Sequence, residues 1–360
     1  MVKIFRAMLF TGMAMLATSG ATSEDQGFHP IARSDIASIA MPAGALSVMT
    51  YNIKGLPWPI ATGRGAALDR IAGRLIALRR AGQQPGVILL QEAFSDEAQA
   101  LAVRSGYRHV AFGPDAALRS PTRPDAADAA YLRDARWDRG EAMGKSLGSG
   151  LIILSDYPIA ATERMAFPDV ACAGFDCLAN KGVMIAHLAV PGADRVAIVN
   201  THLNARKAAG VAIARTEQAY RRQVALMTRF IARHVPPGER LVLGGDMNIG
   251  GDPQRRTAFF GGFASARLPF VTVTRGGAQQ AAERAEVAEN DLLQSIGKGK
   301  DWLFARGAAG AGAMVLGAQT PFGSEAQGEP LSDHVGYVVH YAMAQGRADA
   351  PVRIAMAESR

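Results

Sequence analysis

Residues 46–53 read LSVMTYNI and residues 87–92 read VILLQE. The first segment predicts a β-strand, and the short apolar run in the second is typical of a buried strand. Asn52 stands near the end of the first segment, and Glu92 directly follows the apolar run of the second. Polar side chains at strand ends are the way in which a rigid sheet presents a catalytic cluster.

Further segments place polar residues beside apolar, strand-like runs. In chain order they are His202 after VAIVNT, Asp246 and Asn248 at the end of LVLGGDMN, Asp301 at the start of DWLF, and Asp333 and His334 before the last strand. Each of them alone has an ordinary structural explanation. The GDMN segment, for example, is typical of a turn, because Asp and Asn favour turns. Only the complete ordered set indicates a catalytic cluster.

The remaining pattern predicts two β-rich stretches, each interrupted by a long helix. Apolar residues at helical spacing indicate the two helices. They are Leu68, Ile71, Leu75 and Leu78 in the first, and Tyr220, Val224, Met227 and Ile231 in the second. Helices on the outer faces of two packed sheets would satisfy this pattern. A doubly wound parallel sheet is an alternative that the periodicity leaves open.

The N-terminus has the layout of a secretory signal peptide. Lys3 and Arg6 precede an apolar run, and small residues that suit cleavage follow it. The run is too short for a bilayer core, which needs about 20 residues. We therefore expect a periplasmic or secreted protein. The expected organisation is a signal peptide at 1–21, a flexible lead-in at 22–45, a catalytic domain at 46–342 and a C-terminal tail at 343–360.

Composition indicates a folded protein with a mild excess of positive charge. Apolar residues make up 49% of the 360 residues, which permits a substantial core. The formal charge is +7, and loss of Lys3 and Arg6 with the signal peptide leaves 37 basic against 32 acidic residues, or +5. This excess suits an anionic substrate or surface, but it is too small to specify nucleic acid.

The chain has two cysteines, Cys172 and Cys177, in the segment CAGFDC. In an exported protein this spacing favours a local disulfide. A zinc site is disfavoured because no second Cys or His cluster accompanies the pair. Two buried free thiols are the remaining alternative.

Hydrolysis of a phosphodiester needs a cation that neutralises phosphate charge, a base for the attacking water, and donors for the developing charge. Mg²⁺ prefers oxygen ligands, for which Glu92 is the strongest candidate. His334 can act as the base, oriented by a carboxylate such as Asp301. Asp246 and Asn248 lie two residues apart, so on an extended chain they point the same way.

The ordered set resembles the endonuclease/exonuclease/phosphatase superfamily. The blocks that carry the resemblance are MTYNIKGLP, LLQEAF, SGLIILSDYPI, NTHLNA, GGDMN, DWLFARG and LSDHVGYVV, which span most of residues 46–341. The resemblance implies an α/β fold, a four-layered α/β sandwich of two packed mixed β-sheets flanked by helices.

The same resemblance implies roles for the polar residues. Asn52 and Glu92 form the metal-side pair, with Asp333 a neighbour of that site. His202, Asp246 and Asn248 contact the phosphate and the transition state, and His334 is the general base with Asp301 as its orienting partner. The implied cofactor is Mg²⁺, for which Mn²⁺ or Co²⁺ can substitute.

Within the superfamily, the segment DCLANKGV resembles the neutral sphingomyelinases. The matching residues are Asp176 and Lys181, and a lysine there can bind a phosphate oxygen as a point charge. Asn204, in the block NTHLNA, is a further expected substrate contact. The opening KGLPWP also resembles this branch and places Trp58 near the metal edge. The alternative for DCLANKGV is a plain surface loop.

Two features depart from the sphingomyelinase pattern. The stretch from Asp115 to Lys145 has no counterpart and is expected to be a surface insertion. An exposed apolar element for membrane docking is represented only by Phe259, Phe260 and Phe263, which would fit a core equally well.

The resulting hypothesis is an exported, Mg²⁺-dependent phosphodiesterase of the phospholipase C type. It would cleave sphingomyelin or a related phospholipid into a lipid and a phosphorylated head group, act as a monomer and touch the membrane only peripherally. The alternatives are a nuclease, with nucleic acid as substrate, a phosphatase of the same superfamily, or a non-catalytic binding protein. The complete polar set argues against the last of these.

Overall fold

The structure is a computed structural model that describes residues 44–343 except 127, 269, 272–274, 286–287 and 309–312. The expected signal peptide lies outside the described residues. So do residues 22–43 of the lead-in and residues 344–360 of the tail. No helix among the described residues is long and apolar enough to cross a membrane.

A six-stranded sheet carries the first group of site residues. Its strand order is β10-β11-β1-β2-β4-β3. The strands are β1 (Ala45–Gly55), β2 (Val87–Ala93), β3 (His109–Phe112), β4 (Ile152–Ser155), β10 (Met314–Phe322) and β11 (Gly336–Ala342). β1 and β2 run parallel, whereas the other neighbours are antiparallel. The sheet is therefore mixed, and the carboxyl ends of β1 and β2 share one edge.

A five-stranded sheet carries the second group, in the order β5-β6-β7-β8-β9. The strands are β5 (Ile159–Ala166), β6 (Gly182–Val190), β7 (Asp194–His202), β8 (Arg240–Asp246) and β9 (Asp301–Arg306). Only β7 and β8 pair in parallel. Two mixed sheets exclude the doubly wound alternative.

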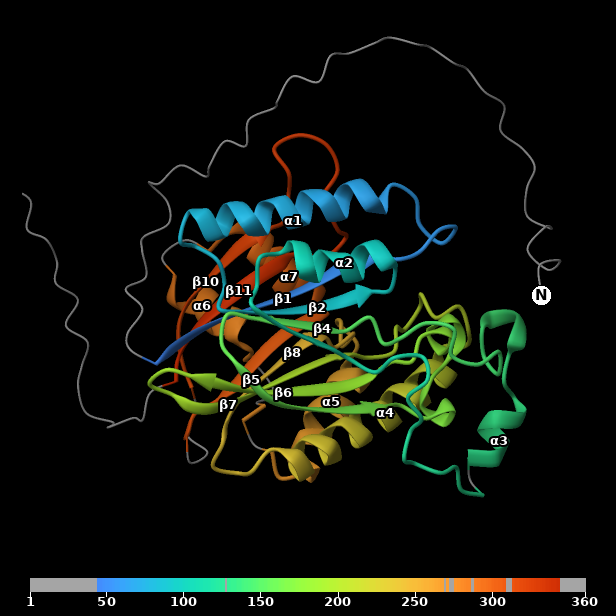
Figure 1. Ribbon diagram of the computed structural model, residues 1–360. Coiled ribbons are helices and arrows are strands. Elements are labelled where there is room, and N and C mark those ends of the chain that lie inside the picture. Colours follow the sequence, from blue (N-terminus) through green and yellow to red (C-terminus); the bar gives the residue numbers. More distant parts are fainter. Residues whose placement is uncertain are drawn as a thin grey trace, which may run out of the picture. The chain divides into compact units, whose positions relative to one another are not determined.

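Helices cover the outer face of each sheet (Figure 1). α1 (Arg64–Arg80) and α2 (Asp96–Arg104) pack on the six-stranded sheet, and α4 (Ile213–His234) and α5 (Pro253–Ser265) pack on the five-stranded sheet. The remaining helices are α3 (Asp128–Arg133), α6 (Gly277–Arg284) and α7 (Asn290–Lys298), and short 3₁₀ turns are η1 (Trp137–Arg139), η2 (Asp169–Ala171) and η3 (Gly174–Leu178).

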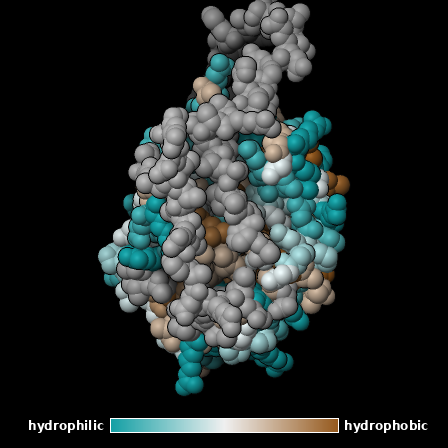
Figure 2. All heavy atoms as spheres, turned by 90° about the vertical axis from the view of Figure 1, so that its left-hand side faces the viewer, coloured by the Kyte–Doolittle hydropathy of each residue, from teal (hydrophilic) through white to brown (hydrophobic). Residues whose placement is uncertain are grey.

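The apolar side chains form three clusters that match these layers. One lies between the sheets and includes Val48, Leu89 and Ile198, while the other two lie beneath the helices. The predicted four-layered α/β sandwich is confirmed. Figure 2 shows the face on the left-hand side of Figure 1, where hydrophilic residues border much of the periphery and a hydrophobic area shows near the centre.

Phe259, Phe260 and Phe263 belong to the core beneath α5. Their exposed fractions are 0%, 4% and 0%. They pack against one another and against Phe304 on β9. Their use for membrane docking is therefore excluded, because a side chain in a helix-sheet interface cannot reach a lipid surface.

The stretch from Asp115 to Lys145 contains α3 and η1 and is mostly exposed, as expected for an insertion. It is nevertheless anchored by buried Glu141, which accepts hydrogen bonds from the backbone N–H of Gly174 at 2.7 Å and from Nε of Arg215 at 2.7 Å.

The predicted disulfide is confirmed, since Cys172 is bonded to Cys177. The insertion and the disulfide both contact the η3 segment.

Candidate active site

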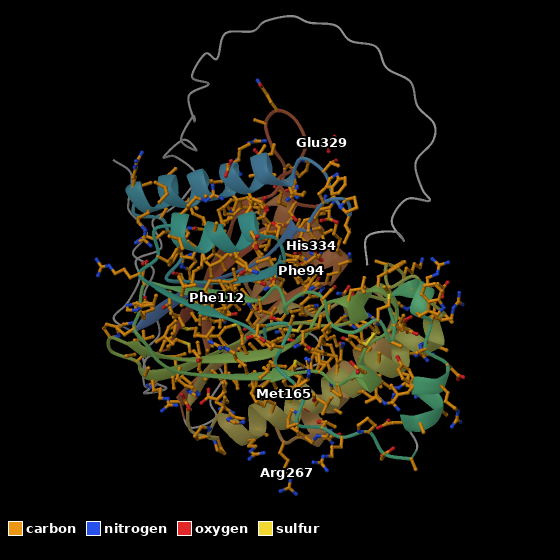
Figure 3. All side chains as sticks on the ribbon, turned by 45° about the vertical axis from the view of Figure 1, so that its right-hand side comes forward. Phe94, Phe112, Met165, Arg267, Glu329 and His334 are labelled. Carbon is orange, nitrogen blue, oxygen red and sulfur yellow. A yellow bond between two sulfur atoms is a disulfide. The ribbon has the colours of Figure 1, made fainter. Side chains whose placement is uncertain are left out.

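Neighbouring strands bring the predicted polar residues to one edge of the two sheets. In the five-stranded sheet, His202 on β7 is in register with Asp246 on β8, and Asp246 is in register with Asp301 on β9. His334 lies just before β11, which pairs with β1. β1 and β2 are parallel in one sheet, and β7 and β8 are parallel in the other, so within each sheet the carboxyl ends of the pair lie at the same edge. Figure 3 labels His334 near the middle of the view, directly above Phe94.

The side-chain amide of Asn52 joins the two sheets. Its Nδ2 donates to Oε1 of Glu92 at 2.9 Å and to Oδ2 of Asp246 at 3.2 Å. Its Oδ1 accepts from the backbone N–H of Lys54 at 3.1 Å. Asn52 is fully buried and every polar atom of its side chain is bonded, so it holds two carboxylates at a fixed separation.

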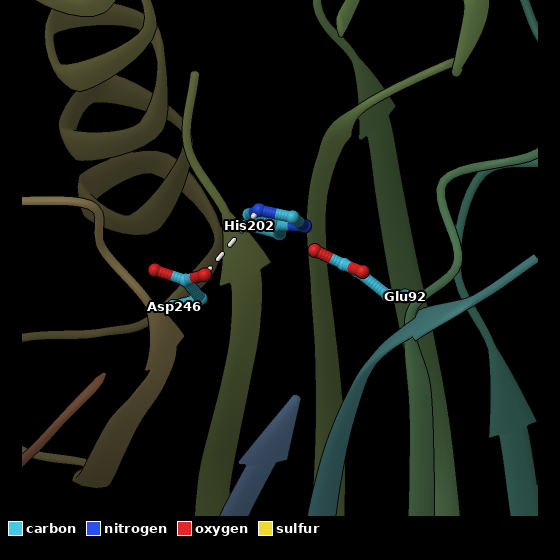
Figure 4. A group of neighbouring side chains, drawn as sticks. All are labelled: Glu92, His202 and Asp246. Atoms are coloured by element: carbon cyan, nitrogen blue, oxygen red, sulfur yellow. Dashed lines mark ion pairs between the residues drawn. The ribbon is translucent and has the colours of Figure 1, made fainter. Parts of the chain in front are cut away.

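The ligand atoms of Glu92, His202 and Asp246 lie within 4.8 Å of one another. Figure 4 shows the three side chains converging, with His202 lying between the two carboxylates. Burial raises the pKa of Glu92, and the nearby charge of Asp246 adds to that effect. Two carboxylates brought together at low solvent exposure repel each other, and a bound cation would relieve that repulsion. Their oxygens suit a hard cation such as Mg²⁺.

Two site residues occupy strained backbone conformations. Glu92 has φ 57° and Asn248 has φ 47°, both in the left-handed region. Asn adopts this region more readily than most residues, but Glu does so rarely. Strain of this kind persists where the surrounding structure imposes it, and it is concentrated at functional sites. At Glu92 it turns the carboxylate at the end of β2 toward Asn52.

His334 and Asp301 form a buried pair. Nδ1 of His334 is 2.7 Å from Oδ2 of Asp301, and Nε2 of His334 is 3.8 Å from Oδ2 of Asp246. Burial lowers the pKa of His334, but the charges of Asp301 and Asp246 outweigh it and raise that pKa to about 9. Burial raises the pKa of Asp301. The arrangement leaves Nε2 facing the carboxylate cluster, with the ring orientation fixed through Nδ1.

His202 has a neutral imidazole. Burial, aided by the adjacent ammonium of Lys181, lowers its pKa to about 3. Nζ of Lys181 is 3.2 Å from Nε2 of His202, 3.2 Å from the Leu203 carbonyl and 3.1 Å from Oδ1 of Asp176. An ammonium can only donate, so Nε2 of His202 accepts and the ring proton lies on Nδ1. Asp176 and Lys181 thus form an ion pair beside His202, and their role toward the substrate stays a prediction.

Asp246 contacts residues of both sheets. Burial would raise its pKa, but the positive charges around it, those of His334 and nearby lysines among them, lower it to about 2, so the carboxylate is ionised. Its Oδ1 accepts from the backbone N–H of Asn248 at 3.0 Å. The Asn248 side chain donates to the Leu203 carbonyl at 3.0 Å instead of extending beside Asp246.

Two predicted residues lie apart from this cluster. The side chain of Asp333 is 60% exposed, and its Oδ2 is 3.8 Å from Nζ of Lys54. Asn204 is fully buried, and its Oδ1 accepts from the backbone N–H of Ala173 at 3.0 Å. The metal role of Asp333 and the substrate contact of Asn204 stay predictions.

The sequence reasoning missed Ser332. Its hydroxyl donates to the Asn52 carbonyl at 2.7 Å and accepts from the His334 backbone N–H at 3.3 Å. Ser332 therefore links Asn52, which holds the two carboxylates, to His334, which is expected to act as the base. Its position directly before Asp333-His334 is the only sequence signal that could have indicated it.

The sequence profile of the "Endonuclease/Exonuclease/phosphatase family" matches residues 49–334. This span contains every residue of the site. The chain belongs to the endonuclease/exonuclease/phosphatase family. Sphingomyelinases of Mycobacterium bovis and Mycobacterium tuberculosis are each 24% identical to it over 304 residues. The aligned region covers 83% of this chain and 53% of the relatives, so the chain spans about half their length.

Solved structures of family members share the fold at low identity. Sphingomyelinase C from Streptomyces griseocarneus is 18% identical with a TM-score of 0.54, over 82% of this chain and 99% of that one. A beta toxin from Staphylococcus aureus with bound magnesium ions is 15% identical with a TM-score of 0.54, over the same shares. D. rerio TDP2 with a single-strand DNA product is 16% identical with a TM-score of 0.53, over 82% and 98%.

The His334–Asp301 pair predicts a specific pH dependence. A general base must be unprotonated to act. Because Asp301 raises the pKa of His334, the presence of Asp301 moves the acid limb of the pH-rate profile to higher pH. Asp301→Asn should shift that limb to lower pH and reduce the maximal rate by about 10²-fold or more. An NMR titration of the cation-free variant should show the same fall in the His334 pKa. An unchanged His334 pKa would contradict the pairing.

Proposed function

We propose that the protein is an exported, Mg²⁺-dependent phosphodiesterase that hydrolyses sphingomyelin or a related phospholipid. The observation that carries this proposal is the convergence of two carboxylates and a His–Asp pair on one sheet edge, joined through the Asn52 amide. Family membership supports phosphodiester hydrolysis, and similarity to sphingomyelinases supports a phospholipid substrate.

Glu92 and Asp246 would hold the cation through carboxylate oxygens, with Asp333 available at the exposed margin of the site. Asn52 would keep both carboxylates in place through its Nδ2, since its Oδ1 accepts from the Lys54 backbone. When bound, Mg²⁺ neutralises charge on the phosphate and favours ionisation of water. Each group of described residues that could hold a metal consists of two carboxylates, one histidine and no cysteine, and such an oxygen-rich set favours Mg²⁺, with Mn²⁺ or Co²⁺ as substitutes.

His334 then takes a proton from the attacking water on Nε2 while Asp301 holds the ring in place. The water oxygen forms a bond to phosphorus, and the ester bond to the lipid oxygen breaks. The leaving oxygen takes up a proton from solvent water, which gives a free lipid alcohol and a phosphorylated head group, and His334 releases its proton to solvent. His202, through its Nδ1–H, and Asn248, through the second N–H of its amide, would donate to the phosphate oxygens and so stabilise the charge of the transition state.

The ion pair of Asp176 and Lys181 supports the lipid substrate over nucleic acid. Lys181 is 4% exposed and contacts both Asp176 and His202, so its charge is directed to the site and not to solvent. A nuclease would present a broad basic groove with stacking aromatic residues. The overall excess of basic residues is small, which favours a single phosphate subsite.

A peripheral membrane contact falls on the loop between β1 and α1. Trp58 is 80% exposed and Ile60 is 61% exposed, and the loop begins beside Lys54 at the site. An amphipathic indole suits the boundary between head groups and acyl chains. Export, supported by the signal-like N-terminus and by the disulfide, would bring the monomer to such a surface.

The metal assignment is tested with Glu92→Gln. EDTA should abolish hydrolysis by the wild type, and Mg²⁺ should restore it. Glu92→Gln should lose most activity and bind Mg²⁺ more weakly while its Tm changes little, because the change removes one ligand charge at nearly constant volume. Activity and Mg²⁺ affinity at wild-type levels would show that Glu92 is not a ligand.

The substrate assignment is tested on Lys181 and Asp176. Wild type and variants are assayed on sphingomyelin vesicles, phosphatidylcholine vesicles, plasmid DNA and a soluble chromogenic phosphodiester. Lys181→Ala and Asp176→Ala should each lower vesicle hydrolysis more than hydrolysis of the soluble diester. The double variant should be little worse than either, as expected for two residues that act as a pair.

Efficient nicking of plasmid DNA by the wild type, with no cleavage of either phospholipid, would overturn the lipid assignment. The nuclease alternative would then stand. Release of phosphate from a monoester only would favour a phosphatase.

A further inference from the structure

Arg255, on α5, is a fully buried arginine behind the site. A buried guanidinium is costly unless its charge is paired and its N–H groups find acceptors. Its Nε donates to both carboxylate oxygens of Glu217 on α4, at 2.9 and 3.2 Å. The charge of Arg255 is therefore balanced inside the helical layer, away from the catalytic carboxylates.

The other contacts of Arg255 go to the two loops that carry catalytic residues. Its Nη1 donates to the carbonyl of Asn204 at 2.9 Å and to the carbonyl of Asn248 at 2.7 Å. Asn204 lies two residues after His202, and Asn248 lies two residues after Asp246. Nη1 of Arg255 is thus hydrogen-bonded to both the loop after β7 and the loop after β8.

Tyr220 on α4 completes this support. The guanidinium carbon of Arg255 lies 4.2 Å from the centroid of the Tyr220 ring. The Tyr220 hydroxyl donates to the carbonyl of Met247, between Asp246 and Asn248, at 3.0 Å. Because the planar fork of an arginine can stack on a ring while it donates at its edge, a lysine cannot replace this geometry.

We propose that Arg255 is a positioning residue for hydrolysis, acting through the Asn204 and Asn248 carbonyls. It fixes His202 and Asn248 relative to Asp246 and helps to hold Asn248 in its left-handed conformation. The inference rests on the proposed phosphodiester hydrolysis, in which His202 and Asn248 contact the phosphate. Misplacement of such groups by about 1 Å can cost about 10² in rate.

Arg306 on β9 provides a matched control. It is 4% exposed, donates to the carbonyls of Pro236 and Glu239, and lies over the ring of Phe270. These contacts are at the end of the five-stranded sheet opposite Asp301, since Arg306 and Asp301 stand at the two ends of β9. Arg306→Lys therefore perturbs a buried arginine of the same kind without touching the site.

The test compares Arg255→Lys with Arg306→Lys on the soluble chromogenic diester with Mg²⁺. Both variants should lower Tm. Arg255→Lys should lower kcat by about 10- to 100-fold with little change in KM, whereas Arg306→Lys should keep kcat within about 2-fold, as expected for a site distant from the chemistry. If Arg255→Lys does not fold, Glu217→Gln carries the same test, because it keeps the arginine but weakens its anchor. It should lower kcat in the same direction by a smaller factor.

Hydrogen exchange gives a readout that does not depend on turnover. The backbone N–H of Leu203 donates to the Asp246 carbonyl, and that of Asn248 donates to the Asp246 side chain. Both amides should exchange faster in Arg255→Lys and not in Arg306→Lys. Equal kcat losses in the two variants, or unchanged exchange at Leu203 and Asn248, would overturn the positioning role. A wild type inactive on every diester would refute the proposed function, while the exchange data would still decide whether Arg255 orders the loops.

Discussion

The site depends on the pair of hydrogen bonds from the Asn52 amide to Glu92 and Asp246. Glu92 belongs to the six-stranded sheet and Asp246 to the five-stranded sheet, so this amide links the two sheets at the site, while Gln91 and Asn200 link them deeper in the fold. Hydrogen bonds to charged groups contribute about 1.5 to 3 kcal/mol each. Their alignment requires the sheets to pack in one arrangement, which the apolar cluster between them provides.

Around that link, each buried charge is held by a different partner. Asp301 faces the His334 imidazole, while Lys181 faces Asp176 and leaves His202 neutral. Environments that move the pKa values of neighbouring groups apart are what allow one residue to act as base while another remains a donor. Glu92 and Asp246 bring two carboxylates together and so form the candidate site for a cation.

Much of this arrangement could be predicted because strand ends have clear sequence signals. Asn52, Glu92, Asp246 and His334 each adjoin an apolar run, and parallel neighbours bring such ends together. The edge strand β10 was not predicted, since its sequence MVLGAQTPF lacks apolar alternation and its side chains are mostly half-buried. Ser332 and Arg255 act largely on backbone carbonyls, which leave no residue pattern to detect. The three phenylalanines of α5 were ambiguous because helical spacing fits a core and a docking face equally well.

We infer that Asn52 assembles a cation site from both sheets, and the anomalous scattering of a crystal of the protein soaked in Mn²⁺ tests this. One strong anomalous peak is expected within coordination distance of a Glu92 oxygen and adjacent to Asn52 and Asp246. A fully occupied peak elsewhere on the molecule, with none between these residues, would contradict it.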